Sequence, residues 1–137
     1  MFYGNNVSCK PINDKYNKIN NPLDLYNMLS NIWCKYTCAP RMRDSWSKDN
    51  MTLGQCSITA FLAQDIFGGD VYGVLLSDGN YHCYNVVGND VFDLTSEQFD
   101  YSLNYNNNPI QSRDVHFNKK EKYERYLYLK SELEKRL

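Results

Sequence analysis

The chain has 137 residues, a net charge of −1 at pH 7 and a hydrophobic fraction of 42%. This length and apolar content indicate one folded domain with its own core and exclude a disordered chain. The balance of acidic and basic residues excludes the cationic footprint of a nucleic-acid binder, and no apolar run approaches the ~20 residues that span a bilayer. We therefore expect neither nucleic acid nor a membrane as a partner.

The cysteine content points to a reducing compartment. The N-terminal residues Met1 to Asn6 contain neither a basic stretch nor an apolar one, so we expect no secretory signal and a cytoplasmic protein. There, the five cysteines are expected to be reduced thiols rather than a disulfide framework. Cys34 and Cys38 are spaced by one helical turn, but no Cys/His pair completes a metal site. We expect no metal and no cofactor.

The first third of the chain predicts an arm, a helix and a loop. Residues 1–20 are polar and lack periodicity, which predicts a flexible N-terminal arm. The dipeptide Asn21-Pro22 predicts a helix start, with Asn as the N-cap and Pro in the first turn. The helix is expected to end before Pro40, and residues 39–53 are expected to form a loop anchored by Trp46. The helical spacing is carried by Leu25, Met28, Leu29, Ile32, Trp33 and Tyr36.

The middle of the chain predicts a helix followed by antiparallel strands. Gly54 permits a tight turn into the helix, and Gly68-Gly69 ends it. The apolar face of this helix consists of Ile58, Phe61, Leu62 and Ile66. Alternating patterns and turn residues, including an Asp-Gly pair, then predict three strands at residues 71–76, 81–87 and 91–94.

The C-terminal third predicts two further helices. Thr95 and Gln98 have the spacing of a capping box, which predicts a short helix. Residues 104–108 are polar and are expected to form a loop. A final helix is expected from Lys119 to the end, with an apolar face formed by Tyr123, Tyr126, Leu127, Leu129, Leu133 and Leu137.

Cys56 is the first candidate for chemistry because it stands at the predicted N-terminus of a helix. Unpaired N–H groups and the positive end of the helix dipole favour the thiolate, which is the nucleophilic form of cysteine. The same N–H groups can hold a developing oxyanion, and the side chain of Gln55 is a second candidate donor. Because Gln55 is adjacent to Cys56, it points about a quarter-turn away, which favours the backbone N–H of Cys56. The alternative is a small buried cysteine in the core.

His82 and Asp93 complete a candidate triad. Histidine is the usual general base at neutral pH, and His82 opens a predicted strand beside a turn. If Gly88-Asn89 is a two-residue hairpin loop, Asp93 lies diagonal to His82 on one face, roughly 7–8 Å away. A three-residue loop would reverse the parity and place Asp93 behind the sheet, opposite Asn85. We prefer the two-residue loop because it buries no lone carboxylate. Asn85 is on the opposite face in a regular strand and is the weaker partner for the imidazole.

The same residues resemble the YunG-type family of small bacterial proteins. The resemblance covers roughly residues 25–137. It is carried by Gly54-Gln55-Cys56-x-x-Thr59-Ala60, Gln64-Asp65, Gly68-Gly69, His82-x-Tyr84-Asn85, Asp93-Leu94-Thr95-x-x-Gln98-Phe99 and Arg125-Tyr126-x-x-Leu129-Lys130. Trp33 with Thr37, and Trp46, also fit this pattern.

The family is similar in layout to papain-like and NlpC/P60-like cysteine hydrolases. The resemblance implies an α+β fold, over residues 21–137, in which helices pack on a small antiparallel sheet. It also implies Cys56, His82 and Asp93 as the catalytic triad, and it names no substrate.

Two classes of function follow from these residues. The first is a cysteine hydrolase or acyltransferase that acts on the carbonyl of an amide, isopeptide or thioester. The second is a non-catalytic protein that keeps the fold and uses its tyrosine-rich surface for binding. A toxin- or immunity-type partner protein is a third reading, which nothing in the sequence tests. The partner is an unknown peptide, amide or acyl substrate, and the oligomeric state is not encoded in these motifs.

Overall fold

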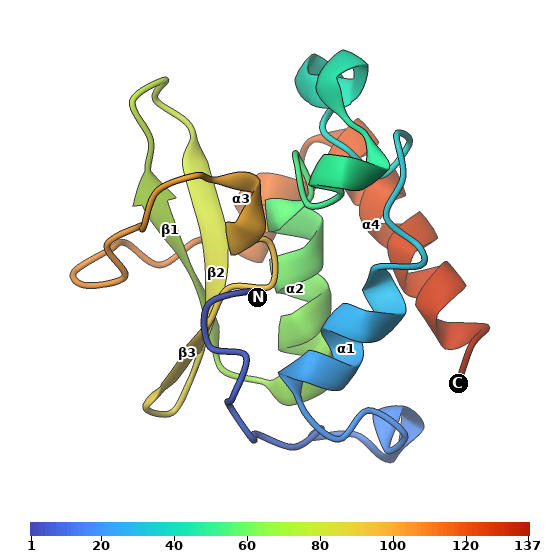
Figure 1. Ribbon diagram of the computed structural model, residues 1–137. Helices are drawn as coiled ribbons and strands as arrows, with labels where there is room; N and C mark the ends of the chain where they lie inside the picture. Colours follow the sequence, from blue (N-terminus) through green and yellow to red (C-terminus); the bar gives the residue numbers. More distant parts are fainter.

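A computed structural model describes residues 1–137 as a mixed α+β fold (Figure 1). Its three-stranded antiparallel sheet has the order β1-β2-β3, formed by β1 (Asp70–Leu75), β2 (Tyr81–Val87) and β3 (Asp90–Phe92). The helices are α1 (Pro22–Leu29), α2 (Cys56–Phe67), α3 (Arg113–Phe117) and α4 (Lys120–Glu134). None of these helices combines the length and the apolarity needed to cross a bilayer.

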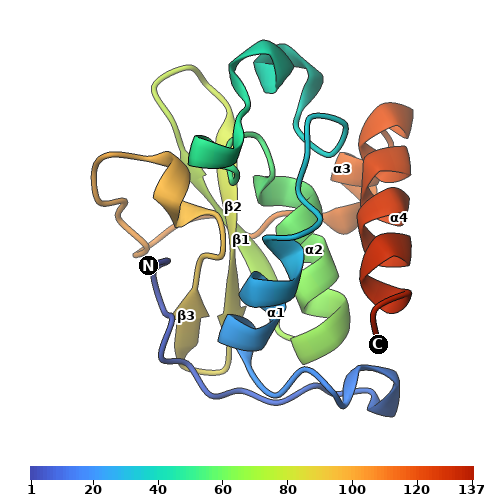
Figure 2. The ribbon, with the colours of Figure 1, turned by 45° about the vertical axis from the view of Figure 1, so that its right-hand side comes forward.

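The central element is α2, which lies between the sheet and α4 (Figure 2). Because neighbours cover it on several sides, α2 is apolar over most of its surface, and eight of its residues are buried. This burial is the main source of stability, since removing apolar surface from water contributes about 25 cal/mol per Å². The fully buried side chains of α2 include Ile58, Phe61, Leu62 and Ile66.

The predicted bounds of α2 are confirmed. Gly54 has φ +70°, a conformation that glycine adopts without strain, and it turns the chain into the helix. A Cβ atom there would lie 2.6 Å from the sulfur of Cys38. At the other end, Gly68 has φ +78° and its N–H donates to the carbonyl of Gln64.

The sheet confirms the two-residue hairpin between β2 and β3. Val87 pairs with Asp90, so Gly88-Asn89 is the loop, and Asn85 pairs with Phe92. The bounds of β2 agree with the prediction, whereas β1 and β3 each begin one residue earlier than expected. With this register Asp93 follows β3 on the same face as His82.

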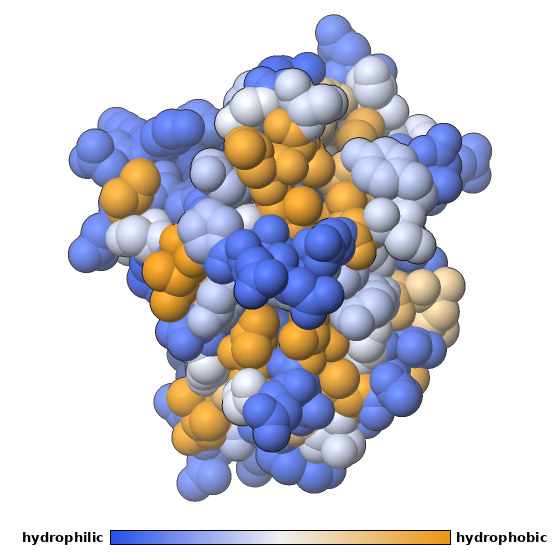
Figure 3. All heavy atoms as spheres, turned by 90° about the vertical axis from the view of Figure 1, so that its left-hand side faces the viewer, coloured by the Kyte–Doolittle hydropathy of each residue, from blue (hydrophilic) through white to orange (hydrophobic).

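Irregular segments cover both edges of the sheet. Tyr3 forms an antiparallel bridge with Asp93 next to β3, and Ile110 forms one with Tyr72 of β1. The N–H of Gln111 donates to the carbonyl of Val71 at 2.7 Å. Edge strands covered in this way cannot pair with other chains. On the surface beyond the sheet, apolar atoms form separate patches interrupted by hydrophilic side chains (Figure 3).

Residues 1–20 run along the domain as an irregular segment. Three of their side chains, Phe2, Tyr16 and Ile19, are buried in the core. The predicted flexibility of this arm stays a prediction, and large movements of the segment would have to withdraw these side chains from the core. The sequence pattern did not predict the burial of these three side chains, because a segment without regular secondary structure buries side chains at irregular spacing.

The predicted first helix is too long. Its N-terminus is as expected, since Asn21 Oδ1 accepts a hydrogen bond from the N–H of Asp24 at 2.8 Å. The helix ends at Leu29, however, where Ser30 turns its hydroxyl to the carbonyl of Asn27. Ile32 and Trp33 are still buried, but they lie in turns after the helix. Cys34 and Cys38 therefore do not lie on a helix.

The chain after β3 also differs from the predictions. Thr95 makes no capping hydrogen bond, and Ser96–Gln98 form only a 3-10 turn. The short helix α3 was not predicted, although Ser112 caps it by accepting a hydrogen bond from Val115. In α4, Tyr126, Leu129 and Leu133 are buried as expected, but Tyr123 and Leu127 are exposed.

The turn into α2 yields the first prediction. Gly54→Ala should destabilise the protein by about 1–3 kcal/mol more than Gly79→Ala, because the new Cβ clashes at residue 54 and meets nothing within 4 Å at residue 79. Both glycines have positive φ, so the control shares the backbone strain. Chemical denaturation monitored by circular dichroism measures the difference. Equal losses would show that the turn before α2 is not tightly packed.

Candidate active site

Cys56 is the first residue of α2, and its half-buried side chain lines a cleft. Gln55 occupies the N-cap position but makes no capping hydrogen bond with its side chain. No capping side chain therefore accepts a hydrogen bond from the N–H groups in the first turn of α2. This end of the helix favours negative charge on the sulfur of Cys56.

The imidazole of His82 and the carboxylate of Asp93 form a buried pair. Nε2 of His82 lies 2.6 Å from Oδ2 of Asp93, and both side chains are 1% exposed. The hydroxyl of Tyr105 donates to the same carboxylate oxygen at 2.8 Å. The N–H and the hydroxyl of Thr95 donate to Oδ1 at 3.2 and 3.4 Å. Because both oxygens of Asp93 have donors, its burial is compensated.

The orientation of the His82 ring is fixed from two sides. Phe99 packs against it edge-on, with ring centroids 4.8 Å apart and planes at 87°. The short bond to Asp93 engages Nε2, which leaves Nδ1 as the ring nitrogen that can exchange a proton with Cys56 in the wall of the same cleft.

Charge separation between Cys56 and His82 is favoured. Hydrogen bonds from Cys83 and from His82 lower the pKa of Cys56 well below its usual value, against the opposing effect of burial. Burial lowers the pKa of His82, but Asp93 and the Cys56 thiolate outweigh it and raise that pKa to about 10. Both shifts favour the form in which Cys56 is a thiolate and His82 is an imidazolium.

The other cysteines have different environments. Its hydrogen bond to Cys56, together with burial, raises the pKa of Cys83 well above its usual value, so Cys83 is a protonated donor. Burial raises the pKa of Cys9 to about 11 and also raises that of Cys38. Among Cys9, Cys38, Cys56 and Cys83, only Cys56 has a lowered pKa.

The two residues expected near the oxyanion or the cleft point elsewhere. Gln55 is fully buried, and its Nε2 donates to the carbonyl of Cys34 at 3.1 Å, while its Oε1 has no partner. Asn85 lies on the face opposite His82 and donates to the carbonyl of Ala60 in α2 at 2.8 Å. Neither amide faces the cleft, so the backbone N–H of Cys56 is the better oxyanion donor.

The cleft has a volume of ≈ 600 Å³ and gathers side chains from distant parts of the chain. Cys56 and His82 lie in its wall with Gln98 and Phe99. The rest of the wall is built by residues 39–42, the turn after β1, and the region where α3 meets α4. A cleft of this size holds a small molecule or a short peptide segment.

Comparison with known proteins places this site in a family. The model of the family described as YunG protein matches residues 21–137. The chain belongs to the YunG family. It is similar to "Uncharacterized protein YunG" of Bacillus subtilis (strain 168), with 29% identity over 103 residues, which cover 75% of this chain and 83% of the relative. No solved structure matches the chain. The YunG match begins after residue 20 and includes Cys56, His82 and Asp93.

Several residues of the site were missed by the sequence reasoning. Tyr105 was assigned to a polar loop, yet its hydroxyl contacts Asp93. The sequence patterns do not point to Cys83, although it contributes to the lowered pKa of Cys56. They do not point to His116 either, yet it lines the same cleft. Sequence alone offered one signal, which is that Cys83 adjoins His82.

Alkylation measures the state of Cys56. At pH 6, iodoacetamide should modify Cys56 faster than Cys9, because an ordinary thiol is less than about 1% ionised there. His82→Ala should slow the labelling of Cys56 by roughly 30- to 100-fold, since the thiolate loses its counter-charge. Peptide mass spectrometry follows both rates. His116→Ala is the control for removing a cleft imidazole, and equal slow labelling of Cys56 and Cys9 would contradict the assignment.

Proposed function

We propose that this protein is a cysteine hydrolase or acyltransferase that acts on an amide, isopeptide or thioester carbonyl. The observations that support the proposal are the buried contact between His82 and Asp93 and the position of His82 in the same cleft wall as the thiol of Cys56. These are the nucleophile, the general base and the orienting group that thiol-dependent acyl transfer requires. Cys56 and His82 line a cleft that a substrate can enter, and Asp93 is buried against His82.

In the proposed first half-reaction, the thiolate of Cys56 attacks the carbonyl carbon. The electron pair moves to the carbonyl oxygen, where the backbone N–H of Cys56 at the N-terminus of α2 stabilises the oxyanion. The imidazolium of His82 then gives its proton to the leaving amine or thiol. The C–N or C–S bond breaks, and the acyl group remains on Cys56 as a thioester.

In the second half-reaction, neutral His82 takes a proton from water or from an acceptor nucleophile. That nucleophile attacks the thioester, and the C–S bond to Cys56 breaks. The product is an acid or a new acyl conjugate, and the thiolate–imidazolium pair is restored. Asp93 holds the tautomer and position of His82 throughout the reaction.

The order of the elements supports a papain-like layout, which we include in the proposal. The nucleophile is at the start of a helix, the histidine lies on β2, and its acidic partner directly follows β3. The helix packs on an antiparallel sheet, as the proposal requires.

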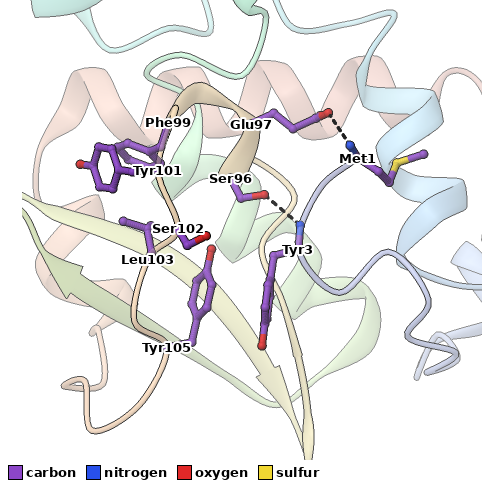
Figure 4. A pocket seen from close by; sticks show the side chains of 9 residues that line it. All are labelled: Met1, Tyr3, Ser96, Glu97, Phe99, Tyr101, Ser102, Leu103 and Tyr105. Carbon is purple, nitrogen blue, oxygen red and sulfur yellow. Dashed lines mark hydrogen bonds and ion pairs between the residues drawn. The ribbon is translucent and has the colours of Figure 1, made fainter.

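The alternative function is binding without turnover, and one observation favours it. A second pocket of ≈ 500 Å³ shares Phe99 with the cleft (Figure 4). Its wall contains Tyr101 and the stacked rings of Tyr3 and Tyr105, whose centroids are 4.3 Å apart. Aromatic walls of this kind suit apolar groups of a ligand. Such a pocket suits a protein that binds its ligand without turnover.

Trapping of the acyl-enzyme tests the proposal. Incubation with a panel of activated thioesters and anilides should add one acyl group to Cys56, detected by intact-protein and peptide mass spectrometry. Cys56→Ser and His82→Ala should each lower turnover by at least about 100-fold, because a general base contributes 10²–10⁴-fold. Cys34→Ser is the matched control and should keep its activity. Absence of both an adduct and turnover across the panel would favour the binding alternative.

The pH dependence of turnover tests the role of Asp93. Turnover should fall as the pH rises through about 10, because His82 then loses the proton that it gives to the leaving group. Asp93→Asn removes the negative charge that raises the pKa of His82, so the alkaline limb should move to lower pH. Tyr105→Phe removes one hydrogen bond to Asp93 but keeps its charge, and it should shift the limb less. An unchanged limb in Asp93→Asn would contradict the proposed role.

A further inference from the structure

The cleft beside Cys56 carries more positive than negative charge. Its wall contains the cations Arg41, Lys119, Lys122 and Arg125 and a single acid, Glu121. The guanidinium of Arg125 is neutralised by Glu121, with Nε and Oε2 2.6 Å apart. This pairing leaves three cations in a chain whose net charge is only −1.

Two of the three remaining cations have no acidic partner. Arg41 lies 3.9 Å from Asp78 in an exposed contact, which contributes little. No carboxylate lies within 4 Å of the ammonium group of Lys119 or Lys122. Cations left unpaired in the wall of a cleft attract anionic ligands, because the surrounding protein focuses their field.

Lys122 is held in place by a chain of hydrogen bonds that leads to the sheet. Its Nζ lies 2.9 Å from Nδ1 of His116, and Nε2 of His116 lies 2.9 Å from Oε1 of Gln111. Burial and the nearby Lys122 lower the pKa of His116 to about 4, so the imidazole is neutral and accepts from Lys122. Gln111 is anchored by its N–H, which donates to Val71 of β1.

This arrangement leaves donors of Lys122 available to a ligand. An ammonium group has three N–H bonds, and the contact with His116 uses one of them. No other hydrogen bond of Lys122 to the protein is present. A cation that is held in place and has free N–H donors is suited to bind a carboxylate. The guanidinium of Arg125 is not available to a ligand in this way, because it already donates to both carboxylate oxygens of Glu121.

We propose that the cleft selects acyl substrates that carry a carboxylate near the scissile carbonyl, and that Lys122 binds this carboxylate. The inference rests on the proposed function, because it places the anion beside the nucleophile Cys56. Lys119 adds to the positive field from the same wall. Lys122 is a specificity residue in this account, since the reaction itself is carried by Cys56 and His82.

Two alkylating agents of similar size test the inference. Iodoacetate carries a carboxylate, whereas iodoacetamide is neutral, and both alkylate the sulfur of Cys56. The ratio of their rates at Cys56 cancels most effects on the intrinsic reactivity of the thiolate. Lys122→Gln should lower the iodoacetate-to-iodoacetamide ratio at Cys56 by about tenfold, and Lys122→Arg should retain most of it.

Matched controls separate local charge from fold and from net charge. Lys120→Gln removes a cation from the same helix, but its side chain is 89% exposed and outside the cleft, so the ratio should not change. Thermal melting establishes that each variant is folded. If Lys122→Gln does not fold, the same two alkylation rates measured on the wild-type protein and on Lys119→Gln test the inference. Added salt should then slow iodoacetate more than iodoacetamide, and Lys119→Gln should lower the ratio.

The outcomes for the two proposals are distinct. Slow alkylation of Cys56 by both reagents would overturn the proposed function, and the ratio would still measure the charge selectivity of the cleft. Rapid alkylation with a ratio that is unchanged in Lys122→Gln and insensitive to salt would overturn the carboxylate inference alone. An equal loss in Lys120→Gln would also overturn it, because the effect would then reflect net charge.

Discussion

The short contact between His82 and Asp93 is the constraint on which the rest of the site depends. Two ionisable side chains, each 1% exposed, meet at 2.6 Å beneath the surface. Burial of such a pair costs several kcal/mol per ion unless nearby donors satisfy the charges. Thr95 and Tyr105 supply those donors to Asp93. Burial lowers the pKa of His82, but Asp93 outweighs this effect and raises that pKa. Removal of one member leaves the others with an uncompensated charge.

Three features of the fold position His82, Asp93 and Cys56. The two-residue loop at Gly88-Asn89 sets the register that places Asp93 and His82 on one face. Tyr3 pairs with Asp93 at the edge of the sheet, so the N-terminal segment also fixes the position of the acid. Gly54 brings the start of α2, and with it Cys56, to the same end of the molecule.

The sequence predicted those parts of the fold that depend on local rules. The bounds of α2 and β2 and the hairpin register follow from apolar spacing and from glycine at positions that need positive φ. The predicted first helix was too long because apolar spacing continues to Tyr36, whereas Ser30 ends the helix by local hydrogen bonding. The capping box failed because the hydroxyl of Thr95 serves Asp93 instead. The tertiary contact with Asp93 therefore took precedence over helix capping by Thr95, and no local sequence pattern predicts such a contact.

The candidate site shows the same division. Cys56, His82 and Asp93 could be proposed from residue type, helix position and strand parity. Tyr105 and the Lys122–His116–Gln111 chain could not, because they reach the site from irregular segments or from other helices. Gln55 was considered for its position beside Cys56, but the turn before α2 directs its amide to Cys34.

The most direct test of the central claim is the protonation state of His82, measured by nitrogen-15 NMR of the two histidine rings. At pH 7.5 the account predicts that His82 is an imidazolium with protons on both nitrogens. His116 should be neutral with its proton on Nε2, which makes it an internal reference. A neutral His82 together with a protonated Cys56 would contradict the account, because no preformed thiolate–imidazolium pair would exist.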